Sequence, residues 1–313
     1  MAEMKFGYFP EPLDFTIGDL SVATLPGLDA QRADVTQSEG VEDDWCFAPL
    51  AKVHDIMTGD VRTRPASGRV FGLPKTHTLS HRASDDVEHL RFIVWMLGFI
   101  YGIRLTESEA GFLDATPIKP GKLHDVVWLG NSEPKALGIV DAYWHKHAAN
   151  PRIAKGLMGI VHSLFLSETP TLLDFERFIY LYTAFDGCHA VWCAMTRANP
   201  LAGGHSKRIA NLCSAFKRSI PDWADPTPNT VSGVRSGKVF GVRNDTLHDG
   251  LFFDEPWGFQ IYGGIASSGD PNRNILLEMR CLVCRLVFGI VGFNDPDYIL
   301  SPIDTRQQHG AKL

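Results

Sequence analysis

The sequence lacks a basic surplus, and this absence excludes one broad class of protein. Its 30 lysine and arginine residues are outnumbered by 36 aspartate and glutamate residues, which gives a formal net charge of −6. A protein whose whole surface binds nucleic acid would carry the opposite balance. Between residues 172 and 293 the two signs nearly cancel, with 12 basic and 11 acidic residues. Any contact with nucleic acid must therefore be a local patch.

Long apolar runs are also missing. The longest, Phe92–Ile103, is well short of the roughly 20 residues that span a bilayer, and it contains Gly98 and Gly102. We expect a buried helix there. The N-terminus does not show the basic and then apolar segments of a secretory signal peptide. These features predict a cytoplasmic protein without membrane contacts.

Cysteine is sparse and irregularly placed, with six residues in 313. This pattern favours reduced thiols rather than a disulfide framework. Cys281 and Cys284 have the spacing of a zinc half-site, but no second Cys or His pair accompanies them. We expect both in a core helix, and we predict neither a metal ion nor an organic cofactor.

The length predicts two domains, and the pattern predicts a mainly α protein with a small β-containing N-terminal module. Residues 1–82 hold short strand-prone runs between prolines, at Lys5–Phe9, Leu20–Leu25, Gly68–Leu73 and His77–Leu79. We expect a helical connecting region over residues 83–170, a helical bundle over 171–295 and a tail over 296–313.

Helical periodicity begins at Ser84-Asp85-Asp86, where acidic residues suit the positive end of a helix. A strand is expected at Val126–Leu129. A helix beginning at Asn229 or Thr230 is expected to carry the motif described next. Further helices are predicted at 134–150, Ile153–Leu166, Leu172–Arg197, Ser206–Ile220 and Ile275–Val291.

The stretch that carries chemistry is Arg243-Asn244-Asp245-Thr246-Leu247-His248-Asp249-Gly250. Asn244 and His248 are four residues apart and share one face of a helix, and the long side chain of Arg243 can reach that face. A permanent cation, an amide and an imidazole that titrates near neutral pH suit the cleavage of RNA without a metal ion. The alternative is a solvated helix end whose histidine favours the negative pole of the helix dipole.

The pattern Arg243-Asn244-x-x-x-His248-x-Gly250 resembles the Arg-x(4–6)-His signature of the HEPN domain superfamily. The resemblance covers residues 171 to 293 and implies a small helical bundle. Many such domains are metal-independent ribonucleases in phage-defence, abortive-infection and toxin systems, some of them behind an N-terminal module of other origin. The chain departs from the usual pattern at Asp249, an added acid that would weaken RNA binding.

The resemblance implies catalytic roles for Arg243, Asn244 and His248. His248 would act as general base towards a ribose 2′-hydroxyl or as acid towards the leaving oxygen, and Arg243 would stabilise the charge on the phosphoryl group. Asn244 would hold His248 or a phosphate oxygen in place. An acid on the first long helix often faces this motif, so Asp186 is expected to pair with Arg243 or to orient His248. A solvated Asp186 is the alternative.

Partners follow from the same resemblance. We expect an RNA substrate whose backbone contacts Lys207, Arg208, Arg235 and Lys238, although a solvated face is the more common explanation of such charges. We also expect a homodimer in which two copies of the motif share one groove. A phage-derived trigger or another regulatory partner would act at the N-terminal module. The alternative function is a non-catalytic HEPN dimerisation or nucleotide-binding module.

Overall fold

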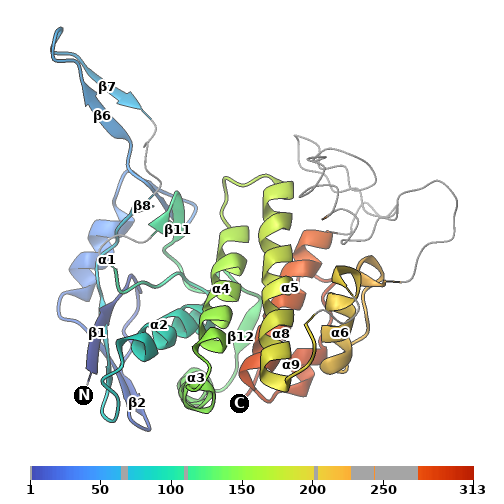
Figure 1. Cartoon of the computed structure of the whole chain (residues 1–313). Helices are drawn as coiled ribbons and strands as arrows, with labels where there is room; N and C mark the ends of the chain where they lie inside the picture. The colour runs from blue at the N-terminus through green and yellow to red at the C-terminus, as the bar shows by residue number, and fades with distance from the viewer. Residues whose placement is uncertain (1, 65–69, 109–111, 201–203, 227–242, 244–273) are drawn as a thin grey trace, which may run out of the picture. The chain divides into compact units, whose positions relative to one another are not determined.

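The computed structural model describes the whole chain except residues 1, 65–69, 109–111, 201–203, 227–242 and 244–273. The chain forms two compact units, Met1–Leu123 with Thr169–Thr171, and His124–Glu168 with Leu172–Leu313. The first unit therefore runs past residue 82, the expected end of the β-containing module. Many of its elements and of those of the second unit are labelled in Figure 1.

A four-stranded antiparallel sheet forms the base of the first unit, in the order β1-β9-β3-β2. Burial alternates along β9, with His77, Leu79 and His81 facing the core, because successive side chains of a strand point to opposite faces. The strands are β1 (Ala2–Phe6), β2 (Phe15–Ile17), β3 (Leu20–Thr24) and β9 (His77–His81).

Helix α2 (Val87–Tyr101) packs on β1 and β9 of this sheet. It begins where the sequence predicts, since the Asp86 side chain accepts a hydrogen bond from the Glu88 backbone N–H at 2.9 Å. It ends at Gly102, whose φ of 59° lies in the left-handed region that glycine adopts easily. The predicted buried helix is confirmed here.

The remaining elements of the first unit are short. A three-stranded sheet has the order β11-β5-β4, β8 pairs with β10, and β6 pairs with β7 in a hairpin that projects from its unit (Figure 1). Their bounds are α1 (Leu28–Thr36), β4 (Val41–Glu42), β5 (Trp45–Phe47), β6 (Ala51–His54), β7 (Val61–Arg64), β8 (Val70–Phe71), β10 (Phe112–Leu113) and β11 (Ala115–Pro117).

His77 makes the first unit sensitive to acid. Its side chain is fully buried and stacks on Phe6 with ring centroids 5.6 Å apart. Burial lowers the pKa of His77 to about 4, although a hydrogen bond to the Glu11 backbone and the charge of Asp14 act in the other direction. The imidazole is therefore neutral in the folded protein at neutral pH.

We predict that His77 makes unfolding easier as the pH falls from about 6.5 towards 4. The unfolded chain, with an imidazole pKa of about 6.5, binds a proton in that window before the folded chain does. The contribution of neutral His77 to the free energy of unfolding is therefore complete above pH 6.5 and is lost as the pH falls to 4, a total of about 3 kcal/mol. Urea unfolding across this range should show a shallower pH slope for His77→Gln than for the parent. His54→Gln, at an exposed histidine, is the control. Equal slopes for parent and His77→Gln would contradict the assignment.

The second unit is mostly helical. The longest helix, α5, packs against α4, α8 and α6. The helices are α3 (Glu133–His147), α4 (Pro151–Ser167), α5 (Asp174–Thr196), α6 (Arg208–Ala215), α8 (Ile275–Val291) and α9 (Pro296–Leu300), with short 3₁₀ turns η1 (His205–Lys207) and η2 (Asp222–Ala224). The predicted helices at 134–150, Ile153–Leu166, Leu172–Arg197 and Ile275–Val291 are confirmed to within about two or three residues.

Two glycines allow α4 and α5 to approach closely. A Cβ atom added at Gly156 would lie 2.6 Å from the Val191 side chain, and one at Gly187 would lie 2.7 Å from Ile160. Contacts that short do not occur between real side chains, so larger residues would force the helices apart. This pairing fixes the helix that carries Asp186.

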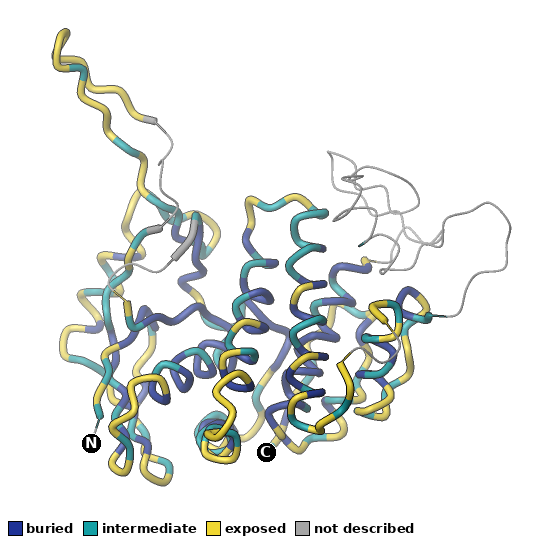
Figure 2. The backbone as a smooth tube through the Cα atoms, viewed as in Figure 1, coloured by how far each residue is buried: buried dark blue, intermediate teal, exposed yellow. Residues whose placement is uncertain are grey.

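Helix α8 supplies the centre of the second unit, and Figure 2 shows it buried along most of its length. Cys281 and Cys284 are buried within it as predicted, and all six cysteines are free. Residues 296–313 are not simply a tail, because they form α9 and the strand β13 (His309–Ala311). β13 pairs in parallel with β12 (Val126–Trp128), which confirms the predicted strand at Val126.

A buried ion pair ties α8 to the loop before β12. Arg285 Nη1 lies 2.5 Å from Asp125 Oδ2, with side-chain exposures of 0% and 3%. Tyr298 donates its hydroxyl to the other Asp125 oxygen at 2.8 Å, and Arg285 also donates to Ser301 Oγ. Burial would raise the pKa of Asp125, but the charge and hydrogen bond of Arg285 and the hydroxyl of Tyr298 hold it below its ordinary value.

The structure belongs to the mixed α and β class, with extensive helix and a small antiparallel sheet region. The expected predominance of helix holds only in part, because strands make up much of the first unit. Across the described ranges, none of the helices is both long enough and apolar enough to cross a bilayer.

Candidate functional site

The best candidate for a chemical site in the described residues lies on one face of α5. Tyr182, Asp186 and His189 are spaced by four and three residues, so they lie above one another on that face. Tyr182 and His189 are buried, whereas the Asp186 side chain is 30% exposed. The carboxylate is therefore the accessible member of the row.

Asp186 pairs with two groups from the segment that follows α5. Its Oδ1 lies 2.7 Å from Nη1 of Arg208, the first residue of α6, and its Oδ2 lies 3.8 Å from Nδ1 of His205 in η1. Arg208 is only 18% exposed and His205 is 42% exposed. A partly buried charged hydrogen bond of this length contributes more than a surface ion pair does.

Arg243, the first residue of the motif, reaches the same face. Its guanidinium carbon lies 6.0 Å from the centroid of the Tyr182 ring, which is the outer range of a cation–π contact. Tyr182 precedes Asp186 by one helical turn. Burial and then the charge of Asp186 raise the pKa of Tyr182 to about 12, while Arg243 and Arg208 act against this rise. Tyr182 is a neutral hydroxyl at physiological pH.

His189 and Cys193 are the buried end of this cluster. Burial, followed by the charge of Arg208, lowers the pKa of His189, and Asp186 acts in the opposite direction. His189 Nε2 lies 3.7 Å from the Cys193 sulfur, but burial raises the pKa of that thiol. A protonated thiol is a poor nucleophile, so this pair does not have the chemistry of a cysteine hydrolase.

The predicted site residues divide into two sets. Asp186 and Arg208 lie together, and Lys207 is exposed next to them. Arg208, which was expected to contact the RNA backbone, forms an ion pair with Asp186 that neutralises part of its charge. Arg243 is described, whereas Asn244, His248, Arg235 and Lys238 fall outside the described residues. The pairing of Asp186 with Arg243 or His248 therefore stays a prediction.

His205 and His189 were missed by sequence reasoning. His189 follows Asp186 by three residues, which already places the two on one helical face. His205 precedes Arg208 by three residues, but its approach to Asp186 depends on how α6 packs on α5. Helical spacing could have identified His189, whereas no local pattern identifies His205.

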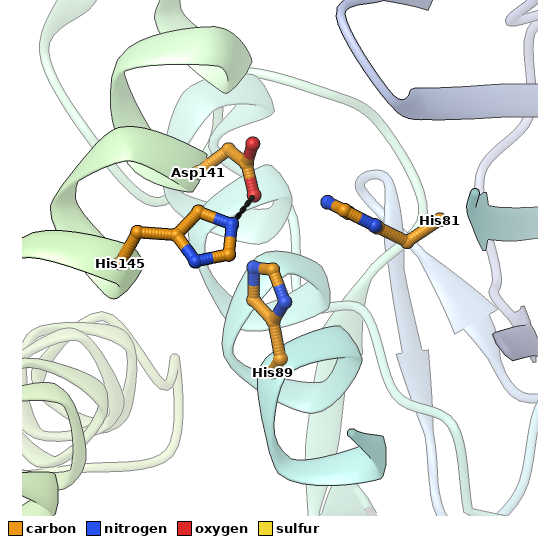
Figure 3. Close-up of side chains that lie close together, drawn as sticks. All are labelled: His81, His89, Asp141 and His145. Carbon is orange, nitrogen blue, oxygen red and sulfur yellow. Dashed lines mark ion pairs between the residues drawn. The ribbon is translucent and has the colours of Figure 1, made fainter. Parts of the chain in front are cut away.

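Two further contacts that involve histidine lie outside this site, one in each unit. In the first unit, the buried rings of His81 and His89 have centroids 5.0 Å apart (Figure 3). The Ala83 backbone N–H donates to Nδ1 of His81 at 3.1 Å, so the neutral ring carries its proton on Nε2. His81 would have to lose that hydrogen bond or that proton to bind a metal ion.

In the second unit, Asp141 and His145 occupy successive turns of α3. His145 Nε2 lies 3.5 Å from Asp141 Oδ1, the contact drawn as a dashed line in Figure 3. His145 is 57% exposed and Asp141 is 21% exposed, and a partly exposed pair at this distance contributes little to stability. An aspartate–histidine pair one turn apart is common on helix surfaces, so it carries less chemical information than the Asp186 cluster.

Comparison with known proteins finds no matching family model, curated protein or solved structure. The Arg243–Gly250 motif and the side chains around Asp186 are therefore the features of the chain that bear on its class.

Proposed function

We propose that the second unit is a HEPN-like helical bundle and that its activity is metal-independent cleavage of RNA. Within that class, the chain would be an endoribonuclease of an antiviral abortive-infection or toxin system. One observation carries the proposal. The Arg243 guanidinium lies over Tyr182, one helical turn from Asp186, with Arg208 and His205 beside that carboxylate.

The proposed reaction is attack by a ribose 2′-hydroxyl on the adjacent phosphorus. His248 takes the 2′-hydroxyl proton as base, or donates a proton to the departing 5′-oxygen as acid. A new bond from O2′ to phosphorus forms while the bond from phosphorus to O5′ breaks, which leaves a 2′,3′-cyclic phosphate and a 5′-hydroxyl. Arg243 stabilises the charge on the phosphoryl oxygens, and Asn244 orients His248. DNA lacks the attacking hydroxyl and would not be cut.

The charge around Asp186 suits a single phosphate group. Arg208 and Arg243 bring two positive charges to a face that holds one carboxylate. Lys207 precedes Arg208 in the sequence and is exposed. Asp186 is then a positioning residue, because it holds Arg208 and His205 rather than touching substrate.

We predict that Asp186→Asn lowers kcat for RNA cleavage by about tenfold without unfolding the protein. The change keeps the shape of the side chain and removes the charge that holds Arg208. The hydrogen bond to Arg208 should weaken by about 1.4 kcal/mol or more, which corresponds to a factor of about ten. KM should change less than kcat, since Asp186 acts through its neighbours. Asp174→Asn is a matched control, because Asp174 lies on the same helix about 18 Å from Asp186. Equal kcat in both variants would remove Asp186 from the site.

Pairing of two chains would complete the cleft. A single copy of the motif would give a shallow site in the proposed arrangement, and a two-fold contact near α5 would bring Arg243 and His248 of both chains to one groove. The test is mass in solution measured together with activity. A monomer that cleaves RNA at the full rate would contradict the shared groove.

The second candidate is a non-catalytic dimerisation or nucleotide-binding module. It is favoured by the ion pair that occupies Arg208 and by Asp249, an added acid next to the motif histidine. Binding of a nucleoside monophosphate that weakens in Arg243→Ala, without cleavage of any RNA, would support it.

A further inference from the structure

The β6–β7 hairpin of the first unit has an exposed apolar tip. Its strands pair in register from Ala51↔Arg64 to His54↔Val61, without a third strand beside them in the described residues. Ile56 and Met57 at the tip are 95% and 93% exposed, the highest values for large hydrophobic side chains in the described ranges. Figure 2 shows the hairpin as almost wholly exposed.

The tip is a built turn and not a loose loop. The Asp55 carboxylate accepts hydrogen bonds from the backbone N–H groups of Met57 at 2.9 Å and Thr58 at 3.2 Å. Gly59 adopts a φ of 76°, which few other residues tolerate. Two-stranded hairpins are marginally stable alone in water, and an ordered apolar tip held out in solvent marks an interaction site.

The same unit contains a cleft of about 1000 Å³ with matching chemistry. Its apolar lining comes from α1, β5, β8 and the residues that follow β8, and packs on the buried Tyr8 and Ile118. Three exposed acids, Asp34, Glu39 and Glu42, stand at its edge and form no ion pair with any residue in the described part of the chain. The apolar side chains that line it are Val35, Cys46, Phe47, Phe71 and Leu73.

The hairpin cannot fill the cleft of its own chain. Lys52 and Thr63, which pair across the hairpin, line the cleft, so the hairpin leaves the unit at its edge. Ile56 lies four residues further out, about 13 Å along an extended strand, and the hairpin points away from its unit (Figure 1). Any hairpin that enters this cleft must come from another molecule.

We propose that the hairpin of one chain docks in the cleft of a second copy. Ile56 and Met57 would cover the apolar lining, while Lys52 and Arg62, both exposed, would meet the acidic edge. Asp55 and Asp60, on either side of the tip, are acids that oppose this contact. Reciprocal exchange of two hairpins gives a two-fold interface in which each copy contributes and receives one arm. The contact is separate from the proposed nuclease cleft and does not depend on it.

Sedimentation of the full chain over a range of concentrations tests the contact. The association constant of Met57→Asp should be at least tenfold weaker than that of the parent, because a charge would enter an apolar surface. Val87→Asp is the control, because it places the same charge at another exposed apolar residue. It lies at the start of a helix, which tolerates acids, and should leave association unchanged. Glu39→Lys/Glu42→Lys should weaken association as Met57→Asp does. A mixture of these two variants should recover a dimer, since one intact arm then meets one intact cleft.

Disulfide trapping locates the contact directly. Cys46 lines the cleft, so Met57→Cys treated with diamide should form a disulfide-linked dimer as the two thiols are oxidised. Peptide mapping should place the new disulfide on Cys46, and the added change Cys46→Ser should abolish that cross-link. A trapped dimer whose disulfide never involves Cys46, a parent chain that stays monomeric at all concentrations, or a mixture that fails to associate would overturn the proposal.

Discussion

Replacement of His248 by alanine is expected to slow RNA cleavage by about 10²- to 10⁴-fold, the usual contribution of a general acid or base. Within Arg243–Gly250, His248 is the side chain that exchanges a proton near neutral pH, so no neighbour can substitute for it. Single-turnover cleavage of a short RNA is the appropriate measurement, because it isolates the chemical step.

The control for that experiment is His145→Ala, which removes an exposed imidazole from α3 of the same unit. It should leave the rate unchanged, and the unfolding temperature should be similar for both variants and the parent. A rate for His248→Ala within about threefold of the parent would contradict the catalytic role, and so would an equal loss in His145→Ala.

The largest loss of stability is expected when the buried ion pair of the second unit is broken. Asp125→Ala leaves the Arg285 guanidinium buried without its carboxylate, which should lower the free energy of unfolding by about 3–5 kcal/mol. Asp125→Ala/Arg285→Met should recover part of this loss, because no charge then remains in the core. Urea unfolding of the four chains, including Arg285→Met alone, forms the double-mutant cycle.

Breaking an exposed ion pair serves as the comparison for the cost of breaking the buried Asp125–Arg285 pair. Asp29→Ala removes the partner of Arg32 on α1, where the side chains are 90% and 46% exposed, and should cost no more than about 1 kcal/mol. The Asp125 contribution should be complete above about pH 4, the ordinary aspartate pKa, and should decline as the pH falls through the lower folded value. A cost below 1 kcal/mol for Asp125→Ala would show that water relieves the buried charge.

Long apolar periodic segments were predictable from the sequence because their signal is repeated over many residues. The limits predicted for α8 match the structure, Ile275–Val291, and α5 is about two residues shorter at its start and one at its end than predicted. Strand β13 was not predictable, since His309-Gly310-Ala311 has little strand propensity and forms through its pairing with β12. Its origin is tertiary.

The sites show the same division. Asp186 was predicted as a site residue because the resemblance places an acid on the first long helix, but its pairing with Arg208 depends on the packing of α6 against α5. Asp125 and Arg285 are separated by 160 residues, and no local spacing connects them. The β6–β7 hairpin and the cleft could not be predicted from the sequence either, because side-chain exposure and surface shape are defined only in the folded structure.

The most direct test of the proposed function is incubation of the purified chain with total RNA in the presence of EDTA. The motif supplies a histidine and an arginine but no cluster of carboxylates suited to magnesium, so cleavage should proceed without a divalent ion and yield cyclic phosphate ends. His248→Ala should leave the RNA intact under the same conditions. Cleavage that EDTA abolishes and magnesium restores would contradict the mechanism.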